Sequence, residues 1–171
     1  YLKDIRQHDR WFKYWHDFAE KNLYGIEISE QISRAAKMNM IIHDDGHTNV
    51  ITSDGLVSDE TIIAKTNNHG FKYGTFDFII TNPPFGSTVR QSEQAYLMTY
   101  QLGKKEEDWL AVATPSQNTR DGQSTEVLFI EQDYKFLKEG GYLAIVLPDG
   151  ILTNSSMQYV RTQIEDWFRI I

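Results

Sequence analysis

The sequence of 171 residues predicts an α/β fold with a mostly parallel sheet. Short apolar or β-branched runs alternate along the chain with segments of helical spacing, which is typical of successive β-α-β units. In addition, residues 76–80 form a nearly continuous apolar run, as expected of a strand buried on both faces of a parallel sheet. Hydrophobic residues make up 40% of the chain, so we expect residues 1–171 to form one domain around one core.

Residues 1–22 predict a helical lead-in. Apolar and charged side chains follow each other there at the spacing of an amphipathic helix. Aromatic side chains at this spacing belong more often to a core than to a platform for stacking bases, so we expect core residues, some of them exposed because the upstream half is missing. They are Trp11, Phe12, Tyr14, Trp15 and Phe18.

Residues 23–52 predict a β-α-β unit. Its first strand ends at the carboxylate of Glu27, and Ser29 is expected to cap a helix that runs to about Ile42. The second strand covers residues 49–52 and is followed by a polar connection.

The rest of the chain predicts two more strands and two helices. The strand over residues 76–80 stops at a proline pair, which has no backbone donor. Residues 126–138 predict a helix with Gly140-Gly141 as its stop, residues 142–147 predict another buried strand, and Pro148-Asp149-Gly150 turns the chain into a last helix.

Polar or special residues follow all four predicted strands. The carboxyl ends of parallel strands meet at one edge of a sheet, where ligands bind in such folds, so we expect these residues to converge. They are Glu27, Asp54, the segment Asn82-Pro83-Pro84-Phe85, and Pro148-Asp149.

Composition excludes several classes of protein. No cysteine is present, which excludes a disulfide framework, a thiolate nucleophile and cysteine-ligated metal centres, and favours a cytoplasmic location. No run of apolar residues reaches the ~20 that a membrane helix needs. The net charge of -7 argues against a protein that grips nucleic acid by itself. If DNA is the substrate, other chains or domains must supply many of the contacts to the DNA backbone.

Asn82-Pro83-Pro84-Phe85 is the most informative motif in the sequence. The two prolines fix φ and remove two donors, so carbonyl oxygens are the backbone polar groups that remain. Asn82 adds a side-chain oxygen, and Phe85 adds a flat apolar face. Such a site suits a planar ring with an amino group, because two acceptors can hold its two protons and aim its lone pair. A rigid turn with a core aromatic residue is the simpler alternative.

This motif resembles motif IV of the S-adenosylmethionine-dependent methyltransferases that modify adenine in DNA. With the flanking segments, the chain resembles the modification (M) subunit of type I restriction–modification systems over most of residues 23 to 152. These segments are Gly25-Ile26-Glu27-Ile28, Met38-Asn39 with His43, Asp54-Gly55-Leu56, Phe76-Asp77, and Leu147-Pro148-Asp149-Gly150.

The resemblance implies a Rossmann-like methyltransferase fold with S-adenosylmethionine as cofactor. Glu27 would accept hydrogen bonds from the ribose hydroxyls of the cofactor, Ile28 would pack on its adenine, and Asp54 would receive its amino group. Asn82 and the Pro83 carbonyl would hold the target amine, with Asn82 also lining the cofactor site. Pro84 completes the rigid wall, and Phe85 would stack on the flipped adenine. No metal is implied.

The resemblance also implies a domain organisation and partners. Residues 1–22 would be a lead-in, residues 23–86 the half with the cofactor site and the Asn-Pro-Pro-Phe motif, and residues 126–171 a C-terminal β-α part. The family's glycine-rich loop and its strand have no counterpart here, so we expect a truncated domain, an excerpt that is itself inactive. Expected partners are double-stranded DNA, a specificity (S) subunit, a restriction (R) subunit and a second M subunit.

Two other readings fit the same residues. One is an orphan or fused DNA or RNA amino-methyltransferase with the same Asn-Pro-Pro-Phe wall. The other is a degenerate, non-catalytic scaffold domain. A metal site at His43, Asp44, Asp45 and His47 is a further alternative, but we expect a solvated loop there.

Overall fold

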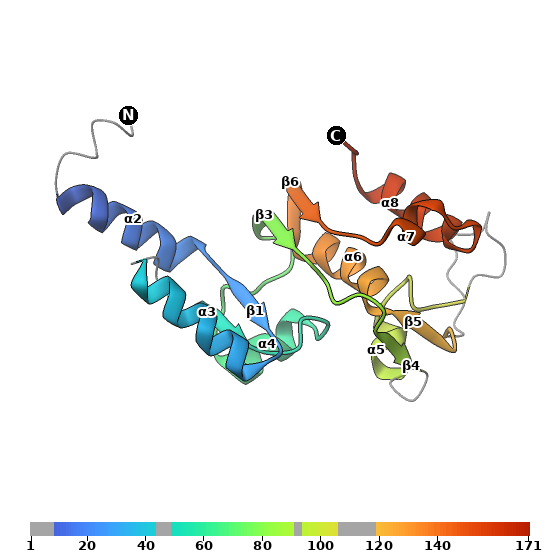
Figure 1. The fold of residues 1–171 in the computed structure, drawn as a ribbon, viewed down its shortest axis with the longest axis horizontal. Helices are drawn as coiled ribbons and strands as arrows, with labels where there is room; N and C mark the ends of the chain where they lie inside the picture. Colours follow the sequence, from blue (N-terminus) through green and yellow to red (C-terminus); the bar gives the residue numbers. More distant parts are fainter. Residues whose placement is uncertain (1–8, 44–48, 91–93, 106–118) are drawn as a thin grey trace. The chain divides into compact units, whose positions relative to one another are not determined.

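The computed structural model describes residues 9–43, 49–90, 94–105 and 119–171, and the chain divides into two compact units (Figure 1). Unit 1 covers residues 1–71 and unit 2 covers residues 72–171. Each unit contains helices and one parallel pair of strands, which confirms the predicted α/β class.

Unit 1 holds the predicted β-α-β unit. Strand β1 (Gly25–Glu27) pairs in parallel with β2 (Val50–Thr52), with Ile26 opposite Ile51. Helix α3 (Glu30–Ile42) connects the two strands, and the Ser29 hydroxyl caps it by accepting a hydrogen bond from the Ile32 N–H. The predicted strands, connecting helix and cap are therefore confirmed.

Helix α4 (Asp59–Thr66) lies where the sequence predicted only a polar connection. Ser58 caps it by accepting from the Thr61 N–H, and Asn67 ends it with a left-handed φ of 56°. The prediction missed this helix because it is short and buries a single side chain, that of Ile62.

The lead-in helix of unit 1 is α2 (Asp9–Asn22), so the described residues confirm a helix; residues 1–8 lie outside them. The expected burial of its aromatic side chains is wrong for Phe12, Tyr14 and Phe18, which are exposed. The buried apolar residues of this unit come from α2, β2, α4 and the segments that follow β2 and α4, and the aromatic side chains of α2 are not among them. These buried residues are Ala19, Val50, Ile51, Leu56, Ile62 and Phe71.

The described residues of unit 2 form two pairs of strands. Strand β3 (Phe76–Thr81) pairs in parallel with β6 (Leu137–Ile145), and β4 (Thr88–Arg90) pairs antiparallel with β5 (Gly122–Ser124). Its other elements are α5 (Gln94–Thr99), α6 (Thr125–Phe136), α7 (Asp149–Thr153), the 3-10 helix η2 (Ser155–Met157) and α8 (Gln158–Trp167). The expected final helix is confirmed by α8.

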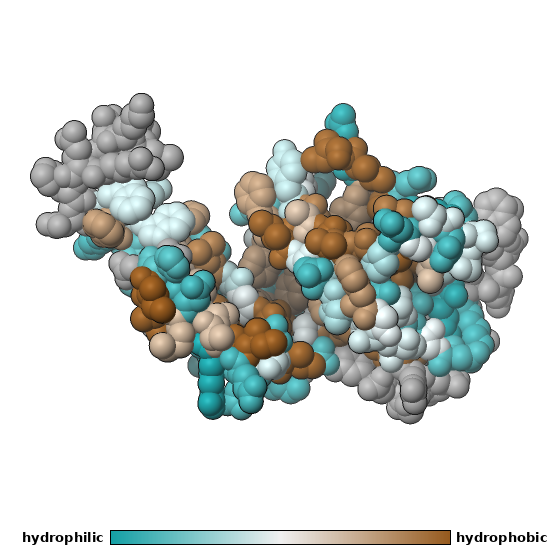
Figure 2. Space-filling model, in the orientation of Figure 1, coloured by the Kyte–Doolittle hydropathy of each residue, from teal (hydrophilic) through white to brown (hydrophobic). Residues whose placement is uncertain are grey.

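Strands β3 and β6 are not buried on both faces, contrary to the prediction. Phe78 and Ile80 are 71% and 87% exposed, and Tyr142 is 56% exposed. The alternate side chains of β6 turn to the other face, where Ile145 packs against the core formed with α6, α7 and α8. The continuous apolar run was therefore no evidence of a strand buried on both faces. Figure 2 shows apolar residues at the molecular surface.

Gly140 and Gly141 do not end the helix that precedes them. Helix α6 stops at Phe136, because Leu137 has extended dihedrals (φ -70°, ψ 137°), and both glycines belong to β6. Gly140 has a φ of +78°, and a Cβ on Gly141 would lie 2.9 Å from the Asp77 carbonyl oxygen. Gly141 thus permits the close approach of β6 to β3, and Gly140 permits the positive φ.

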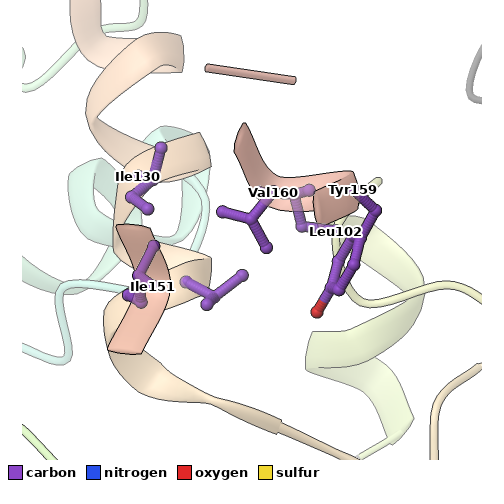
Figure 3. Close-up of a cluster of buried hydrophobic side chains, with 6 residues drawn as sticks. Leu102, Ile130, Ile151, Tyr159 and Val160 are labelled. Atoms are coloured by element: carbon purple, nitrogen blue, oxygen red, sulfur yellow. The ribbon is translucent and has the colours of Figure 1, made fainter. Parts of the chain in front are cut away.

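The core of unit 2 lies between α6, α7 and α8. Figure 3 shows side chains from these helices converging with Leu102. The cluster consists of Leu102, Val127, Ile130, Ile151, Tyr159 and Val160. None of the helices among the described residues is long and apolar enough to cross a membrane.

Candidate active site

In unit 1, the carboxyl ends of β1 and β2 lie side by side. The Ser53 N–H donates to the Glu27 carbonyl oxygen at 3.1 Å, which extends the parallel pair by one step. Glu27 and Asp54 therefore follow neighbouring strands at the same edge, as the sequence predicted for this half of the site.

Both carboxylates are held by their own turns. Glu27 Oε1 accepts from the Ser29 N–H at 2.8 Å, and Asp54 Oδ1 accepts from the Leu56 N–H at 2.9 Å. The side chain of Ile28, which follows Glu27, is 69% exposed. This edge thus presents two oriented acceptor groups next to an apolar surface, a set that fits hydroxyl groups and a planar ring.

In unit 2, Asn82-Pro83-Pro84-Phe85, which we name the 82–85 loop, follows β3. The end of β6 lies beside it, because the Val146 N–H donates to the Thr81 carbonyl oxygen at 3.2 Å. Asn82 and Pro84 are exposed, Pro83 is buried, and the Phe85 ring is 51% exposed. The buried proline anchors the loop, while the amide and the ring face solvent.

Thr125 holds the 82–85 loop from a position distant in sequence. Its Oγ1 donates to the Pro84 carbonyl oxygen at 3.0 Å and lies 3.3 Å from the Ser87 carbonyl oxygen. Sequence reasoning missed this residue. Ser124-Thr125-Glu126 is typical of a helix start. This pattern does not indicate a hydrogen bond to Pro84, which lies 41 residues away in the sequence.

The Pro148-Asp149 turn also follows a strand of unit 2. It begins α7, with the Pro148 carbonyl accepting from the Ile151 N–H at 3.0 Å. The structure thus shows the predicted neighbourhood within each unit, with Glu27 beside Asp54 in unit 1 and the 82–85 loop beside the end of β6 in unit 2.

Asp133 on α6 is a buried carboxyl group with a shifted pKa. Burial raises the pKa of Asp133 from 3.8 to about 7. Its Oδ2 atom has no hydrogen-bond partner among the described residues. Helix α6 therefore carries a group whose charge changes near neutral pH.

A metal centre finds no support in the part of the chain that the structure describes, where no group of three His, Asp or Glu side chains is placed to hold an ion. His43 is the residue after α3, and its N–H donates to the Asn39 carbonyl oxygen. The other residues considered for a metal site, Asp44, Asp45 and His47, lie outside the described residues.

The mixed α/β fold, with its parallel strand pairs, is compatible with a methyltransferase. The sequence model of the family "N-6 DNA Methylase" matches residues 5–166, and the chain belongs to this family. The predicted resemblance to adenine-N6 DNA methyltransferases is thereby confirmed.

One curated relative is "Type II restriction enzyme and methyltransferase RM.BcgI" from Heyndrickxia coagulans. The two sequences are 25% identical over 140 residues, which cover 82% of this chain and 16% of the relative. The chain thus spans a small part of the length of this restriction–modification protein.

Proposed function

We propose that this chain carries the cofactor-binding and base-binding residues of an S-adenosylmethionine-dependent methyltransferase that modifies the exocyclic amine (N6) of adenine in DNA. The observation that carries the proposal is the 82–85 loop. It follows strand β3 and exposes Asn82 and the Phe85 ring to solvent. The Thr125 hydroxyl holds it through a hydrogen bond to the Pro84 carbonyl oxygen. The family match supports the same reaction.

The cofactor-binding residues in this proposal are Glu27, Ile28 and Asp54, together with Asn82 from the 82–85 loop. Glu27 accepts hydrogen bonds from the ribose hydroxyls, and Asp54 accepts from the adenine amino group. Ile28 packs on the adenine ring, for which its exposed apolar side chain is suited. The residues present fit the cofactor, because oriented carboxylates and an apolar side chain match hydroxyl groups and a planar ring.

The base-binding residues act by holding and orienting the target amine. The Asn82 side-chain oxygen and the Pro83 carbonyl oxygen accept its two N–H groups, which directs the nitrogen lone pair, and Phe85 stacks on the flipped base. When bound, S-adenosylmethionine would supply the methyl group from its sulfonium, whose S–CH3 bond breaks to leave a neutral thioether. The product amine then releases its proton to solvent. No metal takes part in this scheme.

We further propose that the chain works within a restriction–modification system. As the M subunit of a type I system it would assemble with an S subunit, an R subunit and a second M subunit. The relative is named both a restriction enzyme and a methyltransferase, which instead favours a single polypeptide that joins restriction and methylation. Affinity purification of the native protein decides: separate S and R polypeptides support the type I assembly, and one large polypeptide supports the fusion.

The experiment that tests the reaction is methyl transfer by the full-length protein. It is incubated with labelled S-adenosylmethionine and double-stranded DNA, and the nucleosides are then separated by mass spectrometry. We expect label in N6-methyladenine. Asn82→Ala removes one of the two acceptors and lowers kcat by at least about 100-fold. The control is Asn154→Ala, since Asn154 is also exposed and its side chain makes no capping hydrogen bond.

Two results would contradict this proposal. Label in methylated cytosine or in RNA alone would assign a different substrate. The absence of transfer by the folded wild-type protein to DNA of diverse sequence would favour the non-catalytic scaffold.

A further inference from the structure

We propose that Thr125 is a positioning residue for methyl transfer, and that its hydroxyl group holds the 82–85 loop in the conformation that binds adenine. This inference rests on the proposed function. It adds a residue that lies outside the Asn-Pro-Pro-Phe motif and that comes from a different element, the first turn of α6.

The contacts of Thr125 span the loop on both sides of Phe85. Its Oγ1 donates to the Pro84 carbonyl oxygen at 3.0 Å, and its backbone N–H donates to the Ser87 carbonyl oxygen at 3.0 Å. Pro83 and Pro84 have no N–H groups, so the loop has few donors with which to stabilise itself. A donor from elsewhere in the chain must therefore fix the Pro84 peptide.

Thr125 can fix the loop because its own position is determined by the core. Two residues in the first turn of α6, Val127 and Leu128, are 0% exposed. The preceding strand β5 is held by Gln123, a buried residue whose Nε2 donates to the Leu102 carbonyl oxygen at 2.8 Å and to the Tyr159 hydroxyl at 2.7 Å. Strand β5 also pairs with β4, so the strand before Thr125 and the strand after the 82–85 loop belong to one antiparallel pair.

The Pro84 peptide lies between the two functional parts of the loop. Asn82 and Pro83 supply the acceptors for the amine, and Phe85 supplies the stacking surface. A rotation of this peptide would move the acceptors relative to the ring. Because a misplacement of ~1 Å can lower a rate ~100-fold, one hydroxyl group that prevents the rotation can control kcat.

The test uses the full-length protein and three substitutions of Thr125. Thr125→Val removes the hydroxyl and keeps the shape, Thr125→Ala removes both, and Thr125→Ser keeps the hydroxyl. The matched control is Thr162→Val on α8, whose hydroxyl also donates to a backbone carbonyl, that of Gln158. Steady-state methyl transfer, melting temperature and hydrogen exchange of residues 85–90 are measured for each.

We expect kcat to fall at least about tenfold in Thr125→Val and Thr125→Ala, with the KM for S-adenosylmethionine changed less than about threefold. Thr125→Ser keeps kcat within about threefold of wild type, and Thr162→Val changes nothing, since neither loses the clamp. Exchange of residues 85–90 becomes faster in Thr125→Val, while exchange within α6 stays the same.

Three outcomes would overturn the inference. One is a wild-type kcat in Thr125→Val. Another is an equal kcat in Thr125→Ala and Thr125→Ser. This comparison is decisive if Thr125→Val has a lowered melting temperature. The third is a wild-type protein that transfers no methyl group, which overturns the proposed function as well; an active wild type with active variants overturns the role of Thr125 alone.

Discussion

The strand ends of unit 1 and unit 2 are held in place by different kinds of contact. In unit 1, Glu27 and Asp54 each accept a hydrogen bond from a backbone N–H two residues further along the chain. In unit 2, the 82–85 loop is held by Thr125, 41 residues away from Pro84. The first arrangement depends on local turns, and the second depends on the packing of a helix.

This difference predicts how each half of the proposed site responds to mutation. The Glu27 carboxylate should tolerate changes in unit 2, because the Ser29 N–H from which it accepts lies two residues further along the chain. The 82–85 loop should respond to changes in the core of unit 2, because its clamp is part of α6. The predictions below test this contrast, starting with the largest expected effect.

Leu128→Ala tests the dependence of the 82–85 loop on α6. Leu128 is 0% exposed, so the substitution leaves a cavity and lowers the free energy of unfolding by about 2–5 kcal/mol. Urea unfolding measures the loss, and hydrogen exchange of residues 85–90 should rise with it. Leu152→Ala is the control, because Leu152 is 56% exposed and its loss should change little. Equal effects of the two substitutions would contradict the contrast.

Asp133→Asn tests the charge state of α6. Burial raises the pKa of Asp133 to about 7, so the folded protein keeps this proton while the unfolded chain loses it near pH 3.8. The free energy of unfolding therefore falls as the pH rises from about 4 to about 7. Above pH 7 it stays lower by up to about 4 kcal/mol than at low pH, as far as this group is concerned.

The asparagine variant cannot ionise. We expect it to be more stable than wild type at pH 8, and to gain much less at pH 4, as measured by urea unfolding at both values. Glu139→Gln provides the control, because Glu139 is exposed. A gain of the same size at both pH values would show that ionisation of Asp133 is not the cause.

Ser29→Ala tests the local contacts of unit 1. The Ser29 hydroxyl caps α3 by accepting from the Ile32 N–H at 3.4 Å, and loss of such a cap costs about 1 kcal/mol. The Ser29 N–H that binds Glu27 remains, so the carboxylate should keep its orientation. Thermal unfolding measures the change, and Ser29→Thr, which keeps a capping hydroxyl, should restore most of the loss. A change in the exchange of residues 85–90 would argue against independent halves.

The same contrast explains what the sequence could predict. Ser29 as a cap, Glu27 at a strand end and the strand before Asn82 follow from neighbouring residues, and each was predicted at its position. The clamp by Thr125 could not be predicted, because nothing near Thr125 identifies Pro84 as its partner.

The burial of strand residues was the other feature that could not be predicted from the local sequence pattern. Phe78 and Ile80 belong to an apolar run that predicts two buried faces, yet both are exposed. Gly140 and Gly141 resemble a helix stop and instead lie in β6, where the backbone of β3 comes close. In both cases the outcome depends on which elements pack together, which a run of neighbouring residues does not encode.

The most direct test of cofactor binding by Glu27 and base binding by Phe85 is titration calorimetry of S-adenosylmethionine, paired with methyl transfer, in the full-length protein. Glu27→Ala should weaken cofactor binding at least about tenfold, since it removes a charged acceptor. Phe85→Ala should leave the Kd within about twofold and still lower methyl transfer by more than about tenfold. The account would be contradicted if Glu27→Ala bound the cofactor as wild type does, or if Phe85→Ala lost cofactor binding to the same degree as Glu27→Ala.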